Sequence, residues 1–575
     1  MPNIRFTLWL ILGAVLYYNY LAWQQDYKPL PQLASAAASG AGARESLGNS
    51  VPTPDGAAAP GTAASAVPAQ STQATPAAAP ATPTAPPDAL GTAPEASAAK
   101  VHVVTDVLDL DISLRGGQID RADLLQYPLH KDTPNVPVRL ENDDAASLYL
   151  VQTGLAAAAG EAAPSHLATF TSAQTTFTLS DGAAELRVPL SWTDDRGLTV
   201  TKTFVFKRGL YRIDLLYDVH NESAAPRSLA SYSQILRHWE HASRSYFDVE
   251  TYSFKGPAVF DGTKSHDLKV ESDPDSKFSE NITNGWLASL QHHFVSAIVP
   301  AENQPYHYQL RVEDHQYLLS ATGPFTQVAP GATATFSEKL FIGPKLQSQL
   351  AATGPRLDLT ADYGLLTVIA HPLFVALNWV HGVTGNWGWA IILVTAFIKL
   401  IFYPLSQASG RSMAKMRAVA PRMKQIQDTF KDDREKLGRA MMDLYKREKI
   451  NPLAGCLPMV VQIPVFISFY WVLVESVEMR QAPFMMWIND LSSHDRFFVL
   501  PLLMGAAMFA QFKLNPAPPD PMQAKIMQFM PLVMTGMMAW FPSGLVLYWL
   551  TNTVLSILQQ WRINQVIQGA AKPSS

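Results

Sequence analysis

The sequence predicts an α-helical polytopic membrane protein with six transmembrane helices, joined to an all-β domain. Composition divides the chain, because residues 24–355 are polar and mixed whereas residues 363–560 are mostly apolar. A chain of 575 residues is also long enough for more than one domain. The candidate spans are the six long apolar segments, residues 6–23, 387–403, 457–474, 497–512, 526–541 and 545–558.

Residues 1–23 are predicted to be an uncleaved signal anchor. Arg5 precedes the apolar run 6–23, which is about long enough to cross a membrane. The nearest small-residue cleavage pattern, at residues 34–36, lies beyond Asp26 and Lys28, whereas cleavage sites follow the apolar region closely. We therefore expect the amino terminus to stay in the cytoplasm.

Residues 24–99 are expected to be a disordered linker. From residue 31 onward they consist mainly of Ala, Pro, Ser, Thr and Gly, with few charges and no aromatic residue. Such a composition cannot bury enough apolar surface to offset the entropy of ordering the chain.

Residues 100–345 are predicted to form an antiparallel β sandwich. Alternation of apolar and polar residues predicts strands at 101–112, 177–192, 199–207, 210–219, 307–321 and 333–341. The strands 199–207 and 210–219 flank a turn at Gly209, which predicts a hairpin. Because this domain follows an anchor whose amino terminus is cytoplasmic, we expect it outside the cytoplasm.

Motifs typical of enzymes are absent from the sequence. It contains no GxxxxGK[ST] phosphate loop, no HExxH and no GxSxG, and the single Cys456 excludes a CxxC pair and an intramolecular disulfide framework. The run at 238–241, His-Trp-Glu-His, offers no assignable further metal ligand, so ordinary surface or core residues are favoured over a metal site. We therefore expect no catalytic residue, no metal, no cofactor and no hydrolysis of ATP.

The charge distribution predicts the topology of the membrane part. Residues 405–450 carry twelve basic and six acidic residues, which places this loop in the cytoplasm. Residues 363–382 are also apolar, but if they crossed the membrane this loop would lie outside. With Pro372 and two histidines, they are predicted to form a periplasmic interfacial amphipathic helix. The remaining connections are a periplasmic loop at 475–496, a cytoplasmic loop at 513–525 and a short cytoplasmic tail at 559–575.

The basic region 405–455 is predicted to form a hairpin of two helices. A seam spaced 3-4-3-4-3 comprises Met413, Met416, Ala420, Met423, Gln427 and Phe430. Residues 432–435 resemble a capping box at the start of the second helix, in which Leu437, Met441 and Leu444 share one face. A solvated basic loop would explain the charge but not the seam. The methionines suit a surface that accepts many shapes, although plain packing is an open alternative.

Lys399 is the only Asp, Glu, Lys, Arg or His residue in the six apolar segments. A charge in hydrocarbon costs roughly 2.5 kcal/mol or more, so a retained one indicates function by default. Thr395 and Tyr403 share its helix face, and polar residues on two other spans are expected to converge with it on a wet cavity. These polar residues are Gln462, Ser468, Tyr548, Thr551, Asn552 and Ser556. The alternative is a lysine that snorkels to the nearby membrane surface.

Short motifs across residues 363–565 resemble the YidC/Oxa/Alb family of membrane protein insertases. They are Asn386-Trp-Gly, Phe397-Ile-Lys-Leu-Ile-Phe-Tyr-Pro404, Ser412-Met-Ala-Lys-Met-Arg417, Asn451-Pro-Leu-Ala-Gly-Cys-Leu-Pro458, Gln462-Ile-Pro-Val-Phe466, Arg480-Gln-Ala-Pro-Phe484 and Phe541-Pro-Ser-Gly-Leu-Val-Leu-Tyr548. The anchor and the β domain add the architecture of the Gram-negative form. The resemblance implies a five-helix core and a periplasmic domain similar to mutarotase-type supersandwiches, without enzymatic activity.

The resemblance also implies a site. The family has a hydrophilic groove open to lipid and cytoplasm, with a cation, usually Arg, at the position of Lys399. Arg stays charged almost anywhere, whereas a desolvated Lys can lose its proton. The expected groove residues are Lys399, Thr395, Gln462, Gln511, Tyr548, Trp549 and Asn552. The expected substrate-receiving residues of the hairpin are Met413, Met416, Met423, Met441 and Met442.

The resemblance implies an insertase and membrane chaperone in the bacterial inner membrane. The implied partners are nascent membrane proteins, the lipid bilayer, the Sec translocon, and possible contacts with the ribosome and the signal recognition machinery, but no nucleic acid directly. Two rival hypotheses are a secondary transporter, which a lone lysine without an acid disfavours, and a cell-envelope scaffold whose sandwich binds sugar.

Overall fold

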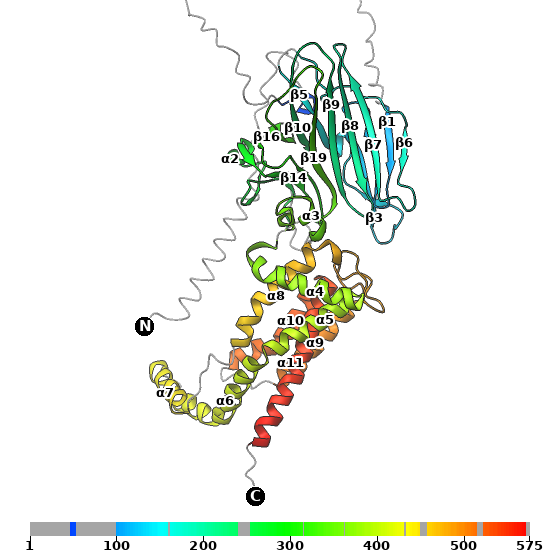
Figure 1. The fold of residues 1–575 in the computed structure, drawn as a ribbon. Coiled ribbons are helices and arrows are strands. Elements are labelled where there is room, and N and C mark those ends of the chain that lie inside the picture. The colour runs from blue at the N-terminus through cyan, green and yellow to red at the C-terminus, as the bar shows by residue number, and fades with distance from the viewer. Residues whose placement is uncertain are drawn as a thin grey trace, which may run out of the picture. The chain divides into compact units, whose positions relative to one another are not determined.

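The computed structural model describes residues 47–52, 99–158, 161–239, 253–313, 315–361, 363–430, 433–448, 457–514 and 521–570. The predicted anchor 1–23, most of the linker 24–99 and the end of the tail lie outside the described residues. The chain divides into two compact units, 1–50 and 51–575. In the first unit the described secondary structure is a 3-10 helix, η1 (Leu47–Asn49), and the second unit carries the sheets and the helices described below (Figure 1).

The β domain is built from two sheets. The larger sheet has the order β13 (Ser279–Thr283), β16 (Pro305–Glu313), β17 (Gln316–Thr322), β10 (Arg227–His238), β5 (Tyr149–Ala157), β3 (Ile119–Pro128), β2 (Leu108–Ser113), β1 (Lys100–Val104) and β6 (Thr176–Thr178), with β18 (Thr326–Val328) on β10 and β4 (Pro137–Arg139) on β3. The second sheet has the order β12 (Ser265–Asp267), β11 (Gly256–Phe260), β14 (Trp286–Leu290), β15 (Phe294–Val299), β19 (Thr333–Pro344), β9 (Arg212–Asn221), β8 (Leu198–Lys207) and β7 (Glu185–Thr193). Strands pair antiparallel, apart from β1 with β6, so the predicted β sandwich is confirmed.

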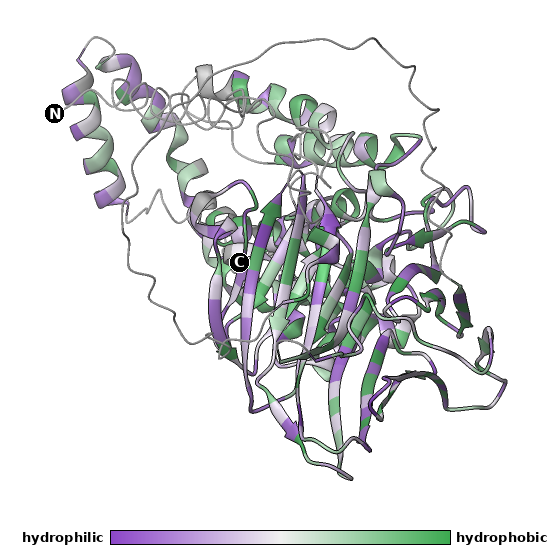
Figure 2. Ribbon diagram, turned by 90° about the horizontal axis from the view of Figure 1, so that it is seen from above, coloured by the Kyte–Doolittle hydropathy of each residue, from purple (hydrophilic) through white to green (hydrophobic). Residues whose placement is uncertain are grey.

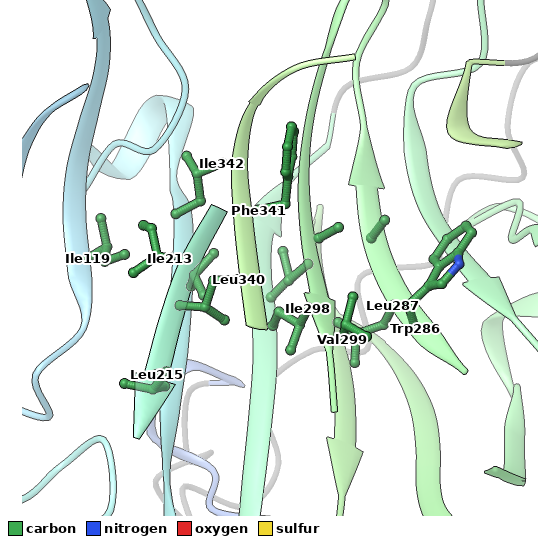
Figure 3. Close-up of a cluster of buried hydrophobic side chains, with 14 of the residues drawn as sticks. Ile119, Ile213, Leu215, Trp286, Leu287, Ile298, Val299, Leu340, Phe341 and Ile342 are labelled. Atoms are coloured by element: carbon green, nitrogen blue, oxygen red, sulfur yellow. The ribbon is translucent and has the colours of Figure 1, made fainter. Parts of the chain in front are cut away.

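The sandwich is held by a continuous apolar core. Figure 3 shows part of it, where Ile213, Leu340, Ile298 and Trp286 come from neighbouring strands of the second sheet. Complete burial of such a side chain contributes about 1.5–3 kcal/mol. The alternation that predicted the strands is visible as bands of hydrophilic and hydrophobic residues along the arrows of Figure 2.

Three of the predicted strands are each two strands. Residues 101–112 form β1 and β2, because the Thr105 hydroxyl accepts hydrogen bonds from the amides of Val107 and Leu108 and closes a turn. Residues 177–192 break into β6 and β7 around Gly182, whose φ of 82° favours glycine. Residues 307–321 form the hairpin of β16 and β17. The predicted hairpin of 199–207 and 210–219 is confirmed as β8 and β9, with Gly209 at φ 72°.

The sandwich also buries a lysine. Lys202 is completely buried, and its Nζ donates to the carbonyls of Gly116 (2.9 Å), Gly117 (2.8 Å) and Thr153 (3.1 Å). Three aromatic rings also face the ammonium, those of Phe170, Phe204 and Tyr217 at 5.3–5.7 Å. Burial lowers the pKa of Lys202 from 10.5 to about 7, and the charge of Glu338 opposes this shift.

The described elements outside the sheets are helices. Short elements are η2 (Ala145–Ser147), α2 (Asp273–Ser276), α3 (Gln347–Thr353), η4 (Leu357–Thr360), η5 (Gly364–Leu366) and η7 (Val477–Met479). The longer helices are α4 (Thr367–Thr384), α5 (Trp387–Ile401), α6 (Tyr403–Thr429), α7 (Arg434–Arg447), α8 (Leu457–Glu475), α9 (Val499–Leu514), α10 (Pro521–Met538) and α11 (Ser543–Ala570). The interfacial helix predicted at 363–382 corresponds to η5 and α4.

Helix ends follow from local chemistry. α4 ends at Gly385, which adopts φ 65°, and α5 begins where the Asn386 side chain accepts a hydrogen bond from the amide of Trp389 (3.2 Å). α5 ends at Ile401 with Phe402 as its C-cap, and α6 begins at Tyr403 with Pro404 in its first turn, where proline is tolerated but cannot donate a hydrogen bond back to α5. The predicted single span 387–403 is therefore a helix that ends early and continues at an angle as α6.

The number of spans is not confirmed. Among the described residues, no single helix is both long and apolar enough to cross a bilayer. The helices Trp387–Ile401 and Tyr403–Ser412, which meet at 60°, are long and apolar enough together. Val460–Glu475 and Val499–Leu514 are shorter apolar helices.

Candidate functional site

A pocket forms where α5, the start of α6, α8 and α11 meet. It encloses about 470 Å³ and is lined by Thr395, Ile398, Lys399, Phe402, Leu405, Ser406, Val461, Gln462, Val465, Tyr548 and Asn552. Five of the seven predicted groove residues are in this lining: Thr395, Lys399, Gln462, Tyr548 and Asn552. The structure therefore brings together polar side chains from three helices that are far apart in sequence.

Lys399 contributes the only charged group of this lining. Its Nζ donates to the hydroxyl of Ser556 at 2.8 Å, and that hydroxyl donates to the carbonyl of Asn552 at 2.7 Å. The side chain is half-buried and leans toward α11. An ammonium has three N–H donors, and Ser556 uses one of them. The Lys399 ammonium is thus fixed by one hydrogen bond to Ser556 while its side chain lines the pocket.

The other polar groups of the lining differ in how far they are satisfied. Thr395 is buried, and its hydroxyl donates to the carbonyl of Ile391 (2.6 Å) in the same helix. The Tyr548 hydroxyl interacts with the side chain of Gln462, and its ring stacks on Phe469 with 4.3 Å between the ring centres. Gln462 and Asn552 are therefore the uncharged groups best placed to bond a guest.

Two predicted groove residues lie outside the lining. Trp549 is adjacent to Tyr548, about 100° further around the helix, and packs edge-on against Phe466 with 4.6 Å between the ring centres. Gln511 is half-buried on α9, a helix that packs against α10 and α11. Conversely, Ser556 was noted in the sequence as part of a polar stripe but not assigned to the groove. Its spacing of four residues from Asn552 is the signal that places it there.

Apolar surface is exposed beside the pocket. On α8 the exposed side chains are Val460, Ile463 and Ile467, and on α10 they include Phe529, Leu532 and Val533. Among the described residues, α8 and α10 share no extensive contact, whereas α10 packs against α9. The two helices therefore present apolar faces without closing on each other.

The helical hairpin of α6 and α7 forms with a shifted seam. Val419, Met423 and Leu444 are its buried residues, and Met416 and Met441 pack around them. The predicted Ala420 is exposed, because Val419 and Ile426 face α7 instead of Ala420 and Gln427. Of the predicted receiving methionines, Met442 is 54% exposed, and the side chain of Met413 lies outside the described part. The cap of α7 is Asp433, which accepts from the amide of Lys436 (3.0 Å).

Comparison with known proteins places the chain in a family. Residues 379–570 match the family model of the 60 kDa inner membrane protein, and residues 100–376 match the model of the YidC periplasmic domain. The chain is 44% identical to the membrane protein insertase YidC of Thioalkalivibrio sulfidiphilus over 100% of both chains. The chain belongs to the YidC family. Its identity to the YidC of Nitrosococcus oceani is 41% over 99% of each chain.

A solved structure gives a further match. It is titled as an active YidC insertase with the first transmembrane domain resolved, with 16% identity, 80% coverage of this chain, 92% of that chain and a TM-score of 0.36. The YidC family model makes the sandwich the periplasmic domain of an inner membrane protein. Its members are insertases and not enzymes, so the expected insertase class is confirmed and the transporter and scaffold hypotheses are disfavoured.

Proposed function

We propose that the pocket around Lys399 is the groove through which this insertase takes nascent transmembrane segments and their short tails into the bilayer. The observation that carries the proposal is an ammonium with one hydroxyl partner, facing a pocket among apolar helices. Moving polar groups out of water without partners costs several kcal/mol, and this is the main barrier to crossing. A groove with a cation and side-chain amide groups lowers that barrier for an acidic tail.

The proposed path begins at the hairpin and ends in lipid. Met442 offers an exposed, adaptable contact for an apolar client helix on the cytoplasmic side. The client then moves along the pocket and leaves between α8 and α10, whose exposed apolar side chains match lipid tails and client alike. Attraction to Lys399 holds the acidic tail while its helix partitions into the bilayer. Partitioning of apolar surface supplies the free energy, so no ATP is required.

We extend the proposal to topology and partners. The excess of basic residues in the hairpin supports a cytoplasmic location of α6 and α7, and with it a topology of six spans and two cytoplasmic termini. Clients are nascent membrane proteins that arrive from the ribosome and the signal recognition machinery, and the protein acts alone or beside the Sec translocon.

Site-specific photocrosslinking tests this path. A photoreactive amino acid at position 399 should crosslink to a stalled nascent membrane protein, and one at position 549, which packs on Phe466 outside the lining, should crosslink less. A third probe at Lys264, in the periplasmic sandwich, is the control and should give no adduct. Equal crosslinking at all three positions, or none at 399, would contradict the assignment of the groove.

A further inference from the structure

A second pocket opens at one end of the β sandwich, and we call it the basic pocket. Both sheets contribute to it, with Arg139, Tyr149 and Arg237 from the larger sheet and Gly256 and Gln291 from the second sheet and its following turn. It encloses about 1090 Å³, part of which is open to solvent. This space lies in the periplasmic domain, and its described lining includes no residue of the helices around Lys399.

The lining of the basic pocket is positively charged. Four of its residues are basic, namely Arg139, Arg237, His238 and Lys255, and no acidic residue is among the described lining. Arg139 pairs with Asp123 at 2.8 Å. Arg237 and Lys255, by contrast, form no ion pair within the described chain. Two cations therefore face the same space, and no carboxylate among the described residues of the lining balances them.

The nearest buried acid does not supply the missing charge. Glu141 is completely buried behind Arg237 and accepts a hydrogen bond from Ser296. Burial raises the pKa of Glu141 to about 8, so this carboxyl is largely protonated at neutral pH. Glu141 therefore balances the positive charge of Arg237 only in part.

Arg237 is held ready for a ligand. Its Nη1 donates to the Ser289 hydroxyl (2.7 Å) and to the carbonyl of Leu290 (3.2 Å), and the guanidinium carbon lies 4.5 Å from the centre of the Tyr149 ring. The Tyr149 hydroxyl in turn donates to the carbonyl of Ser289 (3.2 Å). A guanidinium fixed in this way loses little entropy when it binds an oxyanion.

A further donor belongs to the same lining. The indole Nε1 of Trp239 is buried and has no hydrogen-bond partner in the described structure. Buried donors are nearly always satisfied, so this N–H lacks an acceptor that it would be expected to have. The pocket therefore combines unpaired cations with aromatic side chains in its lining, and one of these aromatic residues carries an unsatisfied N–H.

We propose that the basic pocket binds a phosphate group, with Arg237 and Lys255 as its principal contacts. Phosphate suits this lining because a guanidinium fork matches its geometry, and a free phosphate or phosphate monoester also carries more charge and more acceptor oxygens than a single carboxylate. The phosphate belongs either to an anionic lipid headgroup or to a soluble ion or ester. This function is separate from client insertion and does not depend on the groove around Lys399.

Binding of two probes to the full-length chain in non-ionic detergent tests the proposal. The first probe is inorganic phosphate, titrated by calorimetry, and the second is micelles doped with phosphatidylglycerol, compared with phosphatidylcholine. Lys255→Gln removes an exposed cation of the pocket, and Lys264→Gln makes the same change on the β11–β12 turn outside it. Lys255→Gln should weaken binding about tenfold, the effect of losing one charge-assisted hydrogen bond, and Lys264→Gln should leave it unchanged.

Arg237→Lys keeps the charge but removes the fork, and it should also weaken binding about tenfold. Because Arg237 is half-buried, thermal unfolding is used to check that the Arg237→Lys variant is folded. If this variant does not fold, the binding of Lys255→Gln decides the outcome. Binding of inorganic phosphate supports a soluble ligand, and binding of phosphatidylglycerol micelles alone supports a lipid headgroup. The proposal is wrong if the wild type binds neither probe, if Lys264→Gln weakens binding as much as Lys255→Gln, or if a glutamate-rich peptide binds in place of phosphate.

Discussion

Lys202 in the β sandwich and Lys399 among the helices are both shielded from bulk water, but their ammonium groups have different numbers of hydrogen-bond partners. Lys202 lies in the interior of the sandwich, where three carbonyls accept its three donors and three aromatic rings surround it. Lys399 lies among apolar helices, where one hydroxyl accepts from it and a pocket adjoins it. Burial alone therefore does not indicate function. The number of N–H donors without an acceptor is the better indicator of function, because only a group with such donors can bind a guest molecule.

The largest expected effect is a loss of stability when Lys202, whose three donors all have acceptors, is replaced. Lys202→Met keeps the length of the side chain but leaves the carbonyls of Gly116, Gly117 and Thr153 buried without a donor. The free energy of unfolding of the sandwich should fall by about 3 kcal/mol or more, since each such acceptor costs roughly 1–3 kcal/mol. Chemical denaturation of the purified full-length chain measures this.

The matched control is Lys207→Met in the same strand. Lys207 is 40% exposed and pairs with Asp214 at 3.1 Å on the surface. Exposed pairs contribute about 0–1 kcal/mol, so this variant should unfold almost like the wild type. Equal losses in the two variants would show that the bonds to the Lys202 ammonium contribute nothing.

The second effect concerns the lysine with free donors. Lys399→Ala should reduce insertion of clients with acidic tails about tenfold, the value of one charge-assisted hydrogen bond, with a smaller loss for clients whose tails are uncharged. Lys399→Arg should retain activity because the cation remains. Insertion into inverted membrane vesicles, scored by protease protection of the tail, measures both client classes.

Lys513→Ala provides the comparison for this test, because Lys513 is an exposed cation at the end of α9, outside the pocket lining. It should leave both client classes unaffected. If Lys399→Ala impairs acidic and uncharged tails equally, attraction between Lys399 and the tail is not part of the mechanism.

The third effect is a pH dependence that belongs to Lys202. Because its pKa is lowered from 10.5 to about 7 in the folded state, the unfolded chain binds more protons between these two values. Stability contributed by this group therefore increases as pH rises from about 7 toward 10.5 and is constant below that window. Unfolding measured from pH 7 to 9 should show this increase in the wild type relative to Lys202→Met. Parallel pH curves for the two proteins would contradict it.

The sandwich and the role of Lys399 were both predicted from regular patterns, the sandwich from an alternation and Lys399 from being the one exception to an apolar run. The β8–β9 hairpin followed from alternation around Gly209, and Lys399 followed from being the one charge in the apolar segments. Lys202 also had a signal, because it shares the parity of Val200 and Phe204 in its strand and therefore points inward. That parity was not interpreted as burial of a lysine.

Other features could not be predicted from sequence because they depend on tertiary contacts. The order of the strands within the two sheets follows from pairing between distant segments, such as β10 with β5 and β17. The seam of the hairpin includes Val419 instead of the predicted Ala420. These two positions are adjacent in the sequence, and the packing of α6 against α7 decides which of them is buried. The partner of Lys399 lies 157 residues away, beyond the reach of any local pattern.

The smallest expected effect tests whether that partner positions the cation. Ser556→Ala removes the acceptor 2.8 Å from the Lys399 ammonium, so the side chain gains freedom while its charge is kept. Insertion of clients with acidic tails should fall about threefold, consistent with the roughly 0.5–1.5 kcal/mol of a typical hydrogen bond. Ser556→Thr restores the hydroxyl and should recover activity. In a Lys399→Ala background, Ser556→Ala should cause no further loss, because the group that it positions is gone; an additive loss there would mean that Ser556 acts on the helix packing of α11 and not through Lys399.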